Sequence, residues 1–209
     1  MSHDVRTPPA SAESPERLLA FWFADAATDD DTAARRIETW FGASAAFDGA
    51  CHGSFADWPD RALRGDFDAW RATPRGALAL VLALDQLPRN LFRGTARAFA
   101  YDEAARTVAS AAVERGFDRA VAPIEASFLY LPFEHAEDAA LQERSVALFE
   151  ALHTRAPASL AAAFASFTDY ARRHRDVIAR FGRFPHRNAA VGRASTAAEV
   201  AWLADGNVF

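Results

Sequence analysis

The chain has 209 residues, of which 51% are hydrophobic and 24% charged, and this composition fits one globular domain with a sizeable core. Its net charge is −5 and all 23 basic residues are arginine, so nucleic acid is not a favoured partner. The longest apolar run, Ala77 to Leu84, is far shorter than the ~20 residues of a membrane span, and Met1 to Arg6 lack the apolar region of a signal peptide. We therefore expect a cytoplasmic protein with no membrane partner.

The chain is expected to begin with a tail and to continue as one helical domain. Residues 1–14 are rich in serine, proline and alanine, a composition typical of disorder, and residues 15–209 form the predicted domain. Ser14 followed by Pro15 is a helix-start signal, because serine caps the free N–H groups and proline suits the first helical position. Aromatic residues at irregular spacing, from Phe47 to Trp70, indicate short helices held by aromatic packing.

The next predicted helix begins at Thr73-Pro74 and is apolar on all sides, which indicates burial. We expect it to end in a turn at Asp85–Asn90. Asp85 continues the inward stripe of this helix, and a buried carboxylate must be paired or protonated. Arg89, four residues later, is its natural partner.

Two further helices are predicted before a third that carries acidic residues. Asp102 is expected to cap a helix ending near Arg115, and Pro123 to begin a short segment through Leu131. Pro132 is then expected to open a helix from Phe133 to about His153. When the apolar stripe of that helix is traced back at 100° per residue, Glu134 and Glu137 fall on its inward face and His135 to the side.

The longest predicted helix runs from Pro157-Ala158 to Phe181, and His174 occupies a core position in its apolar stripe. Gly182 can adopt positive φ and Pro185 cannot continue a helix, so the chain should turn there. The stretch from Arg180 to Arg193 combines four arginines with a histidine, an asparagine and two phenylalanines. A polar site sheltered by aromatic rings explains that combination.

These patterns predict an all-α fold. No stretch alternates apolar and polar residues as a strand would, and β-branched residues are sparse. The helices are expected to form antiparallel hairpins in a tetratricopeptide-like arrangement.

The polar residues on apolar stripes indicate a site where acids and arginines meet. In the first interpretation Arg89, Arg183 and Arg187 bind a small anionic molecule or peptide through their forked donors, while Asn90 and Asn188 orient it. The candidate ligand-binding residues are Asp85, Gln86, Arg89, Asn90, His135, Glu137, Arg183, His186, Arg187 and Asn188.

Other interpretations remain beside this one. An enzyme of the hydrolase type would use Glu134 or His174 as a general base. A purely structural ion-pair network would fix how the helices dock, and a scaffold would bind another protein in a helical groove. The spacing Glu134-His135 does not match a zinc-binding HExxH motif, and the sequence indicates no metal, cofactor or oligomeric state.

Three motifs resemble those of a bacterial family called domain of unknown function 924. They are Leu84–Asn90 with Arg93-Gly94, Phe128–Glu137, and Arg180–Arg193 with Ser195-Thr196. The resemblance spans roughly Leu18 to Leu203. It implies an all-helical, tetratricopeptide-like fold and no established activity.

Overall fold

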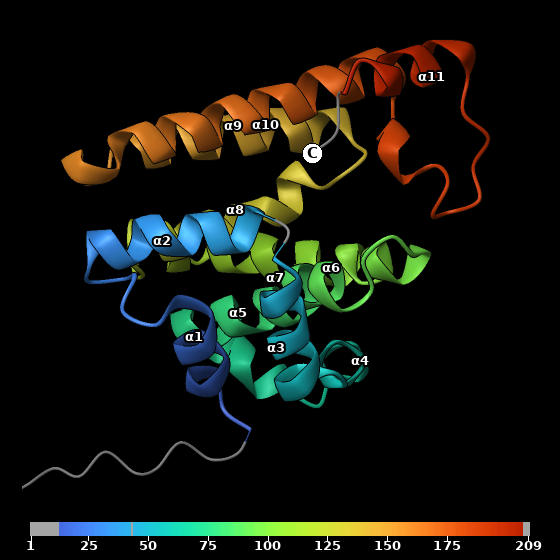
Figure 1. Ribbon diagram of the computed structural model, residues 1–209. Coiled ribbons are helices and arrows are strands. Elements are labelled where there is room, and N and C mark those ends of the chain that lie inside the picture. The colour runs from blue at the N-terminus through green and yellow to red at the C-terminus, as the bar shows by residue number, and fades with distance from the viewer. Residues whose placement is uncertain (1–12, 43, 207–209) are drawn as a thin grey trace, which may run out of the picture.

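The protein is all-helical (Figure 1). The computed structural model describes residues 13–42 and 44–206, so nearly all of the predicted disordered tail lies outside the described residues. Within these ranges the chain forms helices and turns, with no strand, which confirms the predicted fold class. The tetratricopeptide-like arrangement stays a prediction. No helix in the described ranges is both long and apolar enough to cross a membrane.

The helices follow one another with short connections. The α-helices are α1 (Pro15–Phe23), α2 (Asp30–Phe41), α3 (Ala45–Phe55), α4 (Trp58–Arg64), α5 (Pro74–Val81), α6 (Leu87–Leu91), α7 (Asp102–Glu114), α8 (Pro123–Glu134), α9 (Ala139–His153), α10 (Ala161–Phe181) and α11 (Ala197–Ala204). The 3₁₀ segments are η1 (Asp68–Ala72), η3 (Ala96–Phe99), η4 (Phe117–Arg119), η5 (Ala158–Leu160) and η6 (Pro185–Arg187), and η2 (Leu82–Gln86) is a π-helical segment.

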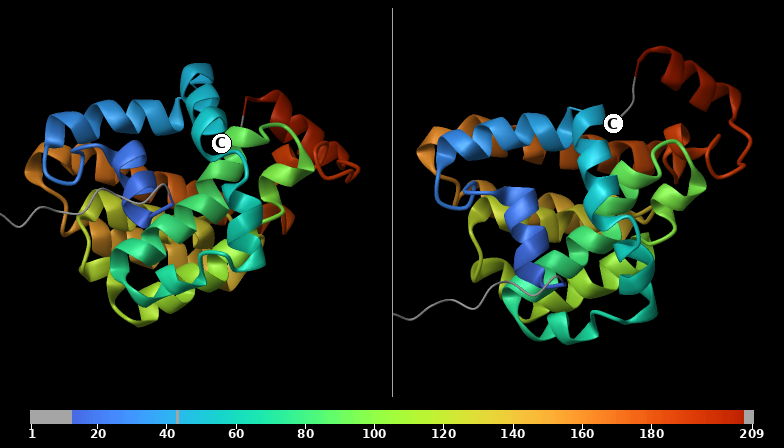
Figure 2. Two further views of the ribbon diagram at one scale, coloured as in Figure 1. Left: turned by 90° about the horizontal axis from the view of Figure 1, so that it is seen from below. Right: turned by 60° about the horizontal axis from the view of Figure 1, so that its bottom comes forward.

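From α5 onward, the longer helices pack on one another in sequence order. The α5 helix packs on α7, α7 on α8, α8 on α9 and α9 along α10. The last pair forms a long hairpin across the top of Figure 1, and Figure 2 shows α11 at the outer edge of the molecule, beyond the bulk of the other helices. This order brings the ends of α6, α8 and α10 toward one region.

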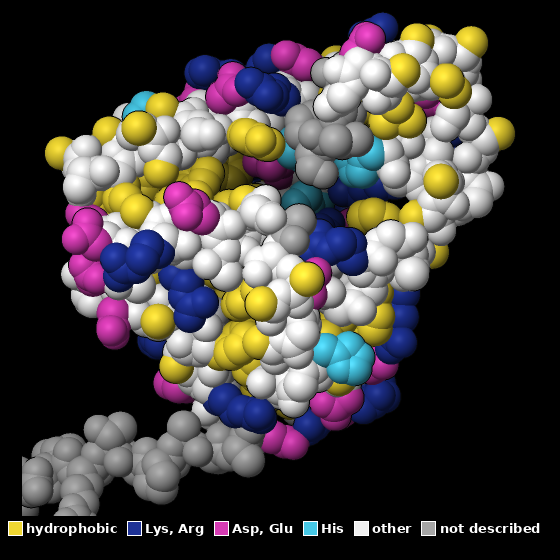
Figure 3. Space-filling view, viewed as in Figure 1, with side chains coloured by type: hydrophobic (Ala, Val, Ile, Leu, Met, Phe, Trp, Pro, Cys, Tyr) yellow, Lys and Arg dark blue, Asp and Glu magenta, His cyan; other side chains and the backbone are white. Residues whose placement is uncertain are grey.

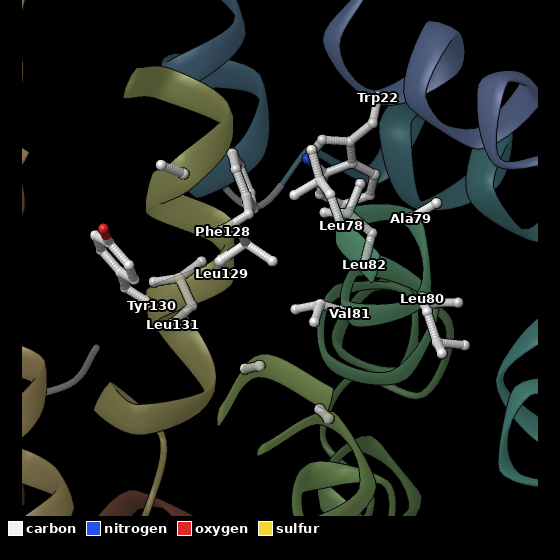
Figure 4. Close-up of a cluster of buried hydrophobic side chains, with 14 of the residues drawn as sticks. Trp22, Leu78, Ala79, Leu80, Val81, Leu82, Phe128, Leu129, Tyr130 and Leu131 are labelled. Atoms are coloured by element: carbon white, nitrogen blue, oxygen red, sulfur yellow. The ribbon is translucent and has the colours of Figure 1, made fainter. Parts of the chain in front are cut away.

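Two helices, α5 and α8, carry the centre of the core (Figure 4). The prediction that α5 is apolar on all sides is confirmed, because every residue from Ala77 to Leu84 is buried. Aromatic rings tie α8 to the first helix, where Trp22 meets Phe128 edge-on with ring centroids 5.9 Å apart. The rigid centre therefore holds the chain segment that leads into Asp85.

The predicted turn at Asp85–Asn90 is wrong, because the helix does not end there. Instead, the helix widens within η2, where Leu87 N–H donates to the Leu82 carbonyl five residues earlier. The chain then continues as α6. Pro88 has no N–H to donate, and it occupies the second position of α6, where none is needed. A π-helical turn of this kind is rare and is frequent at functional sites. It leaves Asp85 with no exposed surface.

The predicted helix start at Pro132 is also wrong. The α8 helix passes through Pro132 and ends at Glu134, and α9 begins at Ala139. Asp138 caps α9 by accepting from Leu141 N–H at 2.9 Å, and a capping carboxylate is a stronger start signal than proline alone. Glu134 thus lies at the C-terminal end of a helix, where the helix dipole disfavours a negative charge.

Other boundary predictions are confirmed, except for the residue that caps α7. The α10 helix ends at Phe181 and Gly182 follows with φ 69°, and His174 lies buried in its stripe. Ser14 caps α1 with Pro15 next. Asp102, by contrast, is the first residue of α7, and Tyr101 occupies the capping position.

Candidate functional site

Charged and histidine side chains gather where η2, α6, α7, α8, α10 and η6 meet. Figure 3 shows histidine, arginine and acidic side chains together in a hollow between the upper helices and the α6 region. Most of these side chains are buried. Each such group must therefore be paired, uncharged or held ready for a ligand.

Asp85 is the innermost group of this cluster. Its carboxylate accepts a hydrogen bond from Gln86 Nε2 at 2.6 Å and from His135 Nδ1 at 2.8 Å, and Arg89 Nη1 lies 3.2 Å away. Burial by itself would raise the pKa of Asp85, but Arg89 and His135 hold it well below its ordinary value. The predicted pairing with Arg89 is confirmed, and Asp85 is ionised.

His135 receives its orientation from this carboxylate. Because an ionised Asp85 can only accept, His135 Nδ1 carries the proton and Nε2 is the unprotonated nitrogen. Burial and the charge of Arg89 lower the pKa of His135, although Asp85 and Asp102 oppose them. The imidazole is therefore neutral at pH 7, and none of the described residues hydrogen-bonds to Nε2.

Asp102 is a site residue that the sequence reasoning missed. It accepts two hydrogen bonds from Arg89, at 2.9 and 3.1 Å, and one from Arg187 Nη1 at 3.3 Å. One carboxylate thus joins α6, α7 and η6. A signal was present, because Asp102 precedes buried Ala105 by three residues and so begins the inward stripe of α7.

Arg187 is buried and has few partners. Its guanidinium lies over the rings of Phe99 and Phe184, at 4.6 and 4.5 Å from their centroids. The contact with Asp102 is its one hydrogen bond to a described residue, and Nε has no acceptor among them. Burial, with the nearby charge of Arg89, lowers the pKa of Arg187 to about 10, so the group stays charged at neutral pH.

Glu134 and His174 lie 3.3 Å apart, from Oε1 to Nδ1. His174 Nδ1 also lies 2.9 Å from the Tyr170 carbonyl oxygen, which can only accept, so Nδ1 carries the proton. Burial lowers the pKa of His174 to about 3, and burial together with the Asp85 charge raises that of Glu134 to about 8. At pH 7 the contact therefore joins a neutral carboxylic acid to a neutral imidazole.

Glu137 and Arg193 close the outer side of the cluster. Arg193 donates two hydrogen bonds to Glu137, at 2.6 and 2.8 Å, and Phe184 N–H donates a third at 2.8 Å. Burial tends to raise the pKa of Glu137, but the hydrogen bonds from Arg193 lower it overall. These bonds fasten the loop after α10 to the end of α8.

The remaining predicted site residues are engaged elsewhere or at the edge of the cluster. Arg183 is paired with Glu199 at 2.6 Å, and Asn90 donates to Asp48 at 2.7 Å. Asn188 donates to Ser195 at 3.1 Å. The ring of His186 lies 5.6 Å from that of Phe184, and burial lowers the pKa of His186 to about 4.

A pocket of about 210 Å³ opens beside the cluster. Its lining residues are Phe99, Asp102, Arg106, His135, Ala136, Glu137, Arg187, Val191 and Arg193. Arg106, on α7, makes no ion pair or hydrogen bond with any other described residue. In and directly behind the pocket, four arginines (Arg89, Arg106, Arg187, Arg193) face three acidic residues (Asp85, Asp102, Glu137), an excess of one basic side chain.

No group of three or more histidine, cysteine, aspartate or glutamate side chains in the described ranges is arranged to hold a metal ion. The chemistry that the arrangement offers is that of donors and a base. The arginines donate hydrogen bonds to an anion, and His135 presents a neutral imidazole at the pocket wall.

Fold and site together define a helical protein in which a buried arginine, carboxylate and histidine cluster supports a polar pocket. The chain belongs to the family described as bacterial protein of unknown function, DUF924, whose profile matches residues 18–207, so the resemblance is confirmed. A solved structure of a protein of unknown function from Agrobacterium tumefaciens is 39% identical, with a TM-score of 0.77 over 92% of this chain and 97% of that one. No curated protein matches the chain.

Proposed function

We propose that the pocket binds a small anionic molecule, held by Arg106 and Arg187. The observation that carries this proposal is the excess of positive charge at the pocket wall. Arg106 has no acidic partner among the described residues. Arg187 has one acidic partner among them, Asp102, at 3.3 Å. Arg187 is buried, and buried donors in proteins are nearly always satisfied, so an acceptor from outside the chain is the natural complement.

The hydrogen-bonding capacity of Arg187 supports the same proposal. A guanidinium offers five N–H donors in a planar fork that matches carboxylate and phosphate oxygens. Only one of these donors has an acceptor among the described residues. The rings of Phe99 and Phe184 hold the guanidinium plane in place, which reduces the side-chain entropy that Arg187 would otherwise lose when a ligand binds.

The size of the pocket limits the ligand. A volume of 210 Å³ equals that of about seven waters at their share of roughly 30 Å³ in the liquid. This space suits a short carboxylate or phosphate compound, or the carboxylate end of a peptide. Arg183 and Asn90 are not part of the proposed site, because Glu199 and Asp48 already engage them.

A thermal-shift series with acetate, succinate, citrate and inorganic phosphate tests the proposal. We expect at least one of these anions to raise the melting temperature of the wild-type protein, as mass action requires of a ligand that binds the native state. Arg106→Ala should abolish that shift and leave the ligand-free melting temperature nearly unchanged, because Arg106 makes no ion pair with the described residues.

Arg119→Ala is the matched control, since Arg119 is an exposed arginine outside the pocket, and it should keep the full shift. Arg187→Lys, which keeps the charge but loses the fork, should weaken the shift. The absence of any anion-dependent shift in the wild type would overturn the proposal, and so would an undiminished shift in both pocket variants.

A further inference from the structure

His135 combines three features of a general base at the wall of this pocket. Its side chain lines the pocket, its Nδ1 is bonded to the buried Asp85 carboxylate at 2.8 Å, and its Nε2 has no hydrogen bond to a described residue. A carboxylate at Nδ1 fixes the tautomer that leaves Nε2 unprotonated and stabilises the imidazolium that forms when Nε2 takes a proton. Asp85 is itself held by Gln86 and Arg89.

Glu134 and His174 are worse placed for this role. Neither lines the pocket, and both are buried. His174 Nδ1 faces the Tyr170 carbonyl, and Glu134 is protonated at pH 7. A carboxylic acid that retains its proton is not a base.

The pocket wall also limits the nucleophile. None of its lining residues is a serine, threonine or cysteine, so the oxygen that His135 activates would come from water. An arginine-bound carboxylate fixes one end of a ligand, and a chain of a few carbons fills the remaining volume. A small dicarboxylic acid esterified at its second carboxyl group meets both conditions.

We propose that the protein hydrolyses monoesters of small dicarboxylic acids, with Arg106 and Arg187 holding the free carboxylate and His135 acting as general base on water. This inference rests on the proposed anion site. The water oxygen bonds to the acyl carbon as His135 Nε2 takes the water proton. The bond from the acyl carbon to the alcohol oxygen then breaks, and His135 returns the proton to that oxygen. One ester and one water give one acid and one alcohol, and no oxidant or reductant is needed.

The test measures release of 4-nitrophenol from the mono-4-nitrophenyl ester of succinic acid, with neutral 4-nitrophenyl acetate in parallel. We expect the wild-type protein to accelerate hydrolysis of the anionic ester far more than that of the neutral one. His135→Gln should reduce the rate by about 10²–10⁴-fold, the usual contribution of a general base. His174→Gln should keep the activity as long as it melts as a folded protein.

Three controls separate chemistry from folding and from binding. His135→Ala should regain part of its activity when imidazole is added, which a variant damaged only in its fold would not do. Asp85→Asn, at the positioning residue, should lower kcat and leave KM for the ester unchanged. Succinate should still raise the melting temperature of His135→Gln, because the arginines remain.

Three results would overturn the inference. They are no acceleration of the anionic ester over the neutral one by the wild type, equal activity in wild type and His135→Gln, and no rescue of His135→Ala by imidazole. If succinate raises the melting temperature while the ester is not hydrolysed, the anion site stands and the catalytic inference fails. If the ester is not hydrolysed and none of acetate, succinate, citrate and inorganic phosphate raises the melting temperature, both proposals fail.

Discussion

At the scale of single residues, Asp102 is the group on which the cluster depends. Its carboxylate is the shared acceptor of Arg89 and Arg187, and its side chain is 16% exposed. Removing one partner of a largely buried ion pair leaves the other charge uncompensated, which costs far more than the intact pair contributes. Surface arginines of this chain do not depend on a single acidic partner in this way, because water stabilises their charge.

We predict that Asp102→Asn lowers the free energy of unfolding by about 3 kcal/mol, since two buried guanidinium groups lose their shared counter-charge. Urea denaturation at pH 7 measures the change. Asp169→Asn is the control, because Asp169 pairs with Arg173 on an exposed helix face and should cost at most about 0.5 kcal/mol. Equal losses in the two variants would show that the cluster is not buried in solution.

The sequence reveals some of these residues and hides others. Asp85 could be found because its helix is apolar on all sides. Arg89, four residues later, could then be identified as its partner. The inward stripe of α7 points to Asp102 but does not name its partners, and Arg106 could not be assigned at all, since an acid followed by an arginine four residues later is an ordinary feature of an exposed helix. The importance of Asp102 comes from its contact with Arg187 in η6, 85 residues further along the chain. Such a long-range contact leaves no periodic pattern in a single sequence.

At the scale of elements, the ends of helices are less predictable than their interiors. The stripe of α10 and the burial of α5 follow from periodicity, whereas proline misleads at two places. Pro88 lies in the first turn of α6, directly after the π-helical segment η2, and Pro132 lies in the last turn of α8. Because buried neighbours hold both segments, tertiary packing overrides the local signal.

Two glycines test how backbone conformation sets these helix ends. Gly182 has φ 69° after α10, whereas Gly49 lies within α3, and neither position has an atom that would obstruct a Cβ. Gly182→Ala should lower the free energy of unfolding by about 1 kcal/mol, the cost of left-handed backbone for a residue with a side chain. Gly49→Ala should raise it by about 0.5–1 kcal/mol. Chemical denaturation measures both changes, and a stabilising Gly182→Ala would contradict the assignment of this turn.

At the scale of the whole molecule, buried ionisable groups make the stability depend on pH in both directions. Burial lowers the pKa of His135, of His174 to about 3 and of His186 to about 4. In the unfolded chain these histidines take up protons near their ordinary value of 6.5, so the folded state loses stability as pH falls below that value. Glu134 acts in the opposite sense, because the folded state keeps its proton up to about pH 8 while the unfolded chain loses it near 4.5.

We therefore predict that the free energy of unfolding is highest near pH 6.5. It should fall by about 2 kcal/mol on the alkaline side up to about pH 8, since each pKa unit corresponds to about 1.4 kcal/mol. Glu134→Gln should remove that alkaline decline, and His174→Gln should reduce the acid one. Denaturation curves at pH 5, 6.5 and 8.5 measure both limbs. An alkaline decline that persists in Glu134→Gln would rule out a protonated Glu134.

The pocket also has a consequence for the order in which the molecule becomes complete. Its walls come from residues 99–106, 135–137 and 187–193, whereas the buried residues of the main hydrophobic cluster lie between Leu18 and Ala171, so the last wall leaves the ribosome after the main core. The last wall is fastened by Arg187 to Asp102 and by Arg193 to Glu137, contacts that close long loops at an entropic cost. A ligand that bridges the walls would favour the closed arrangement by mass action. A bound ligand would then indicate that residues 187–193 have packed against the other two walls.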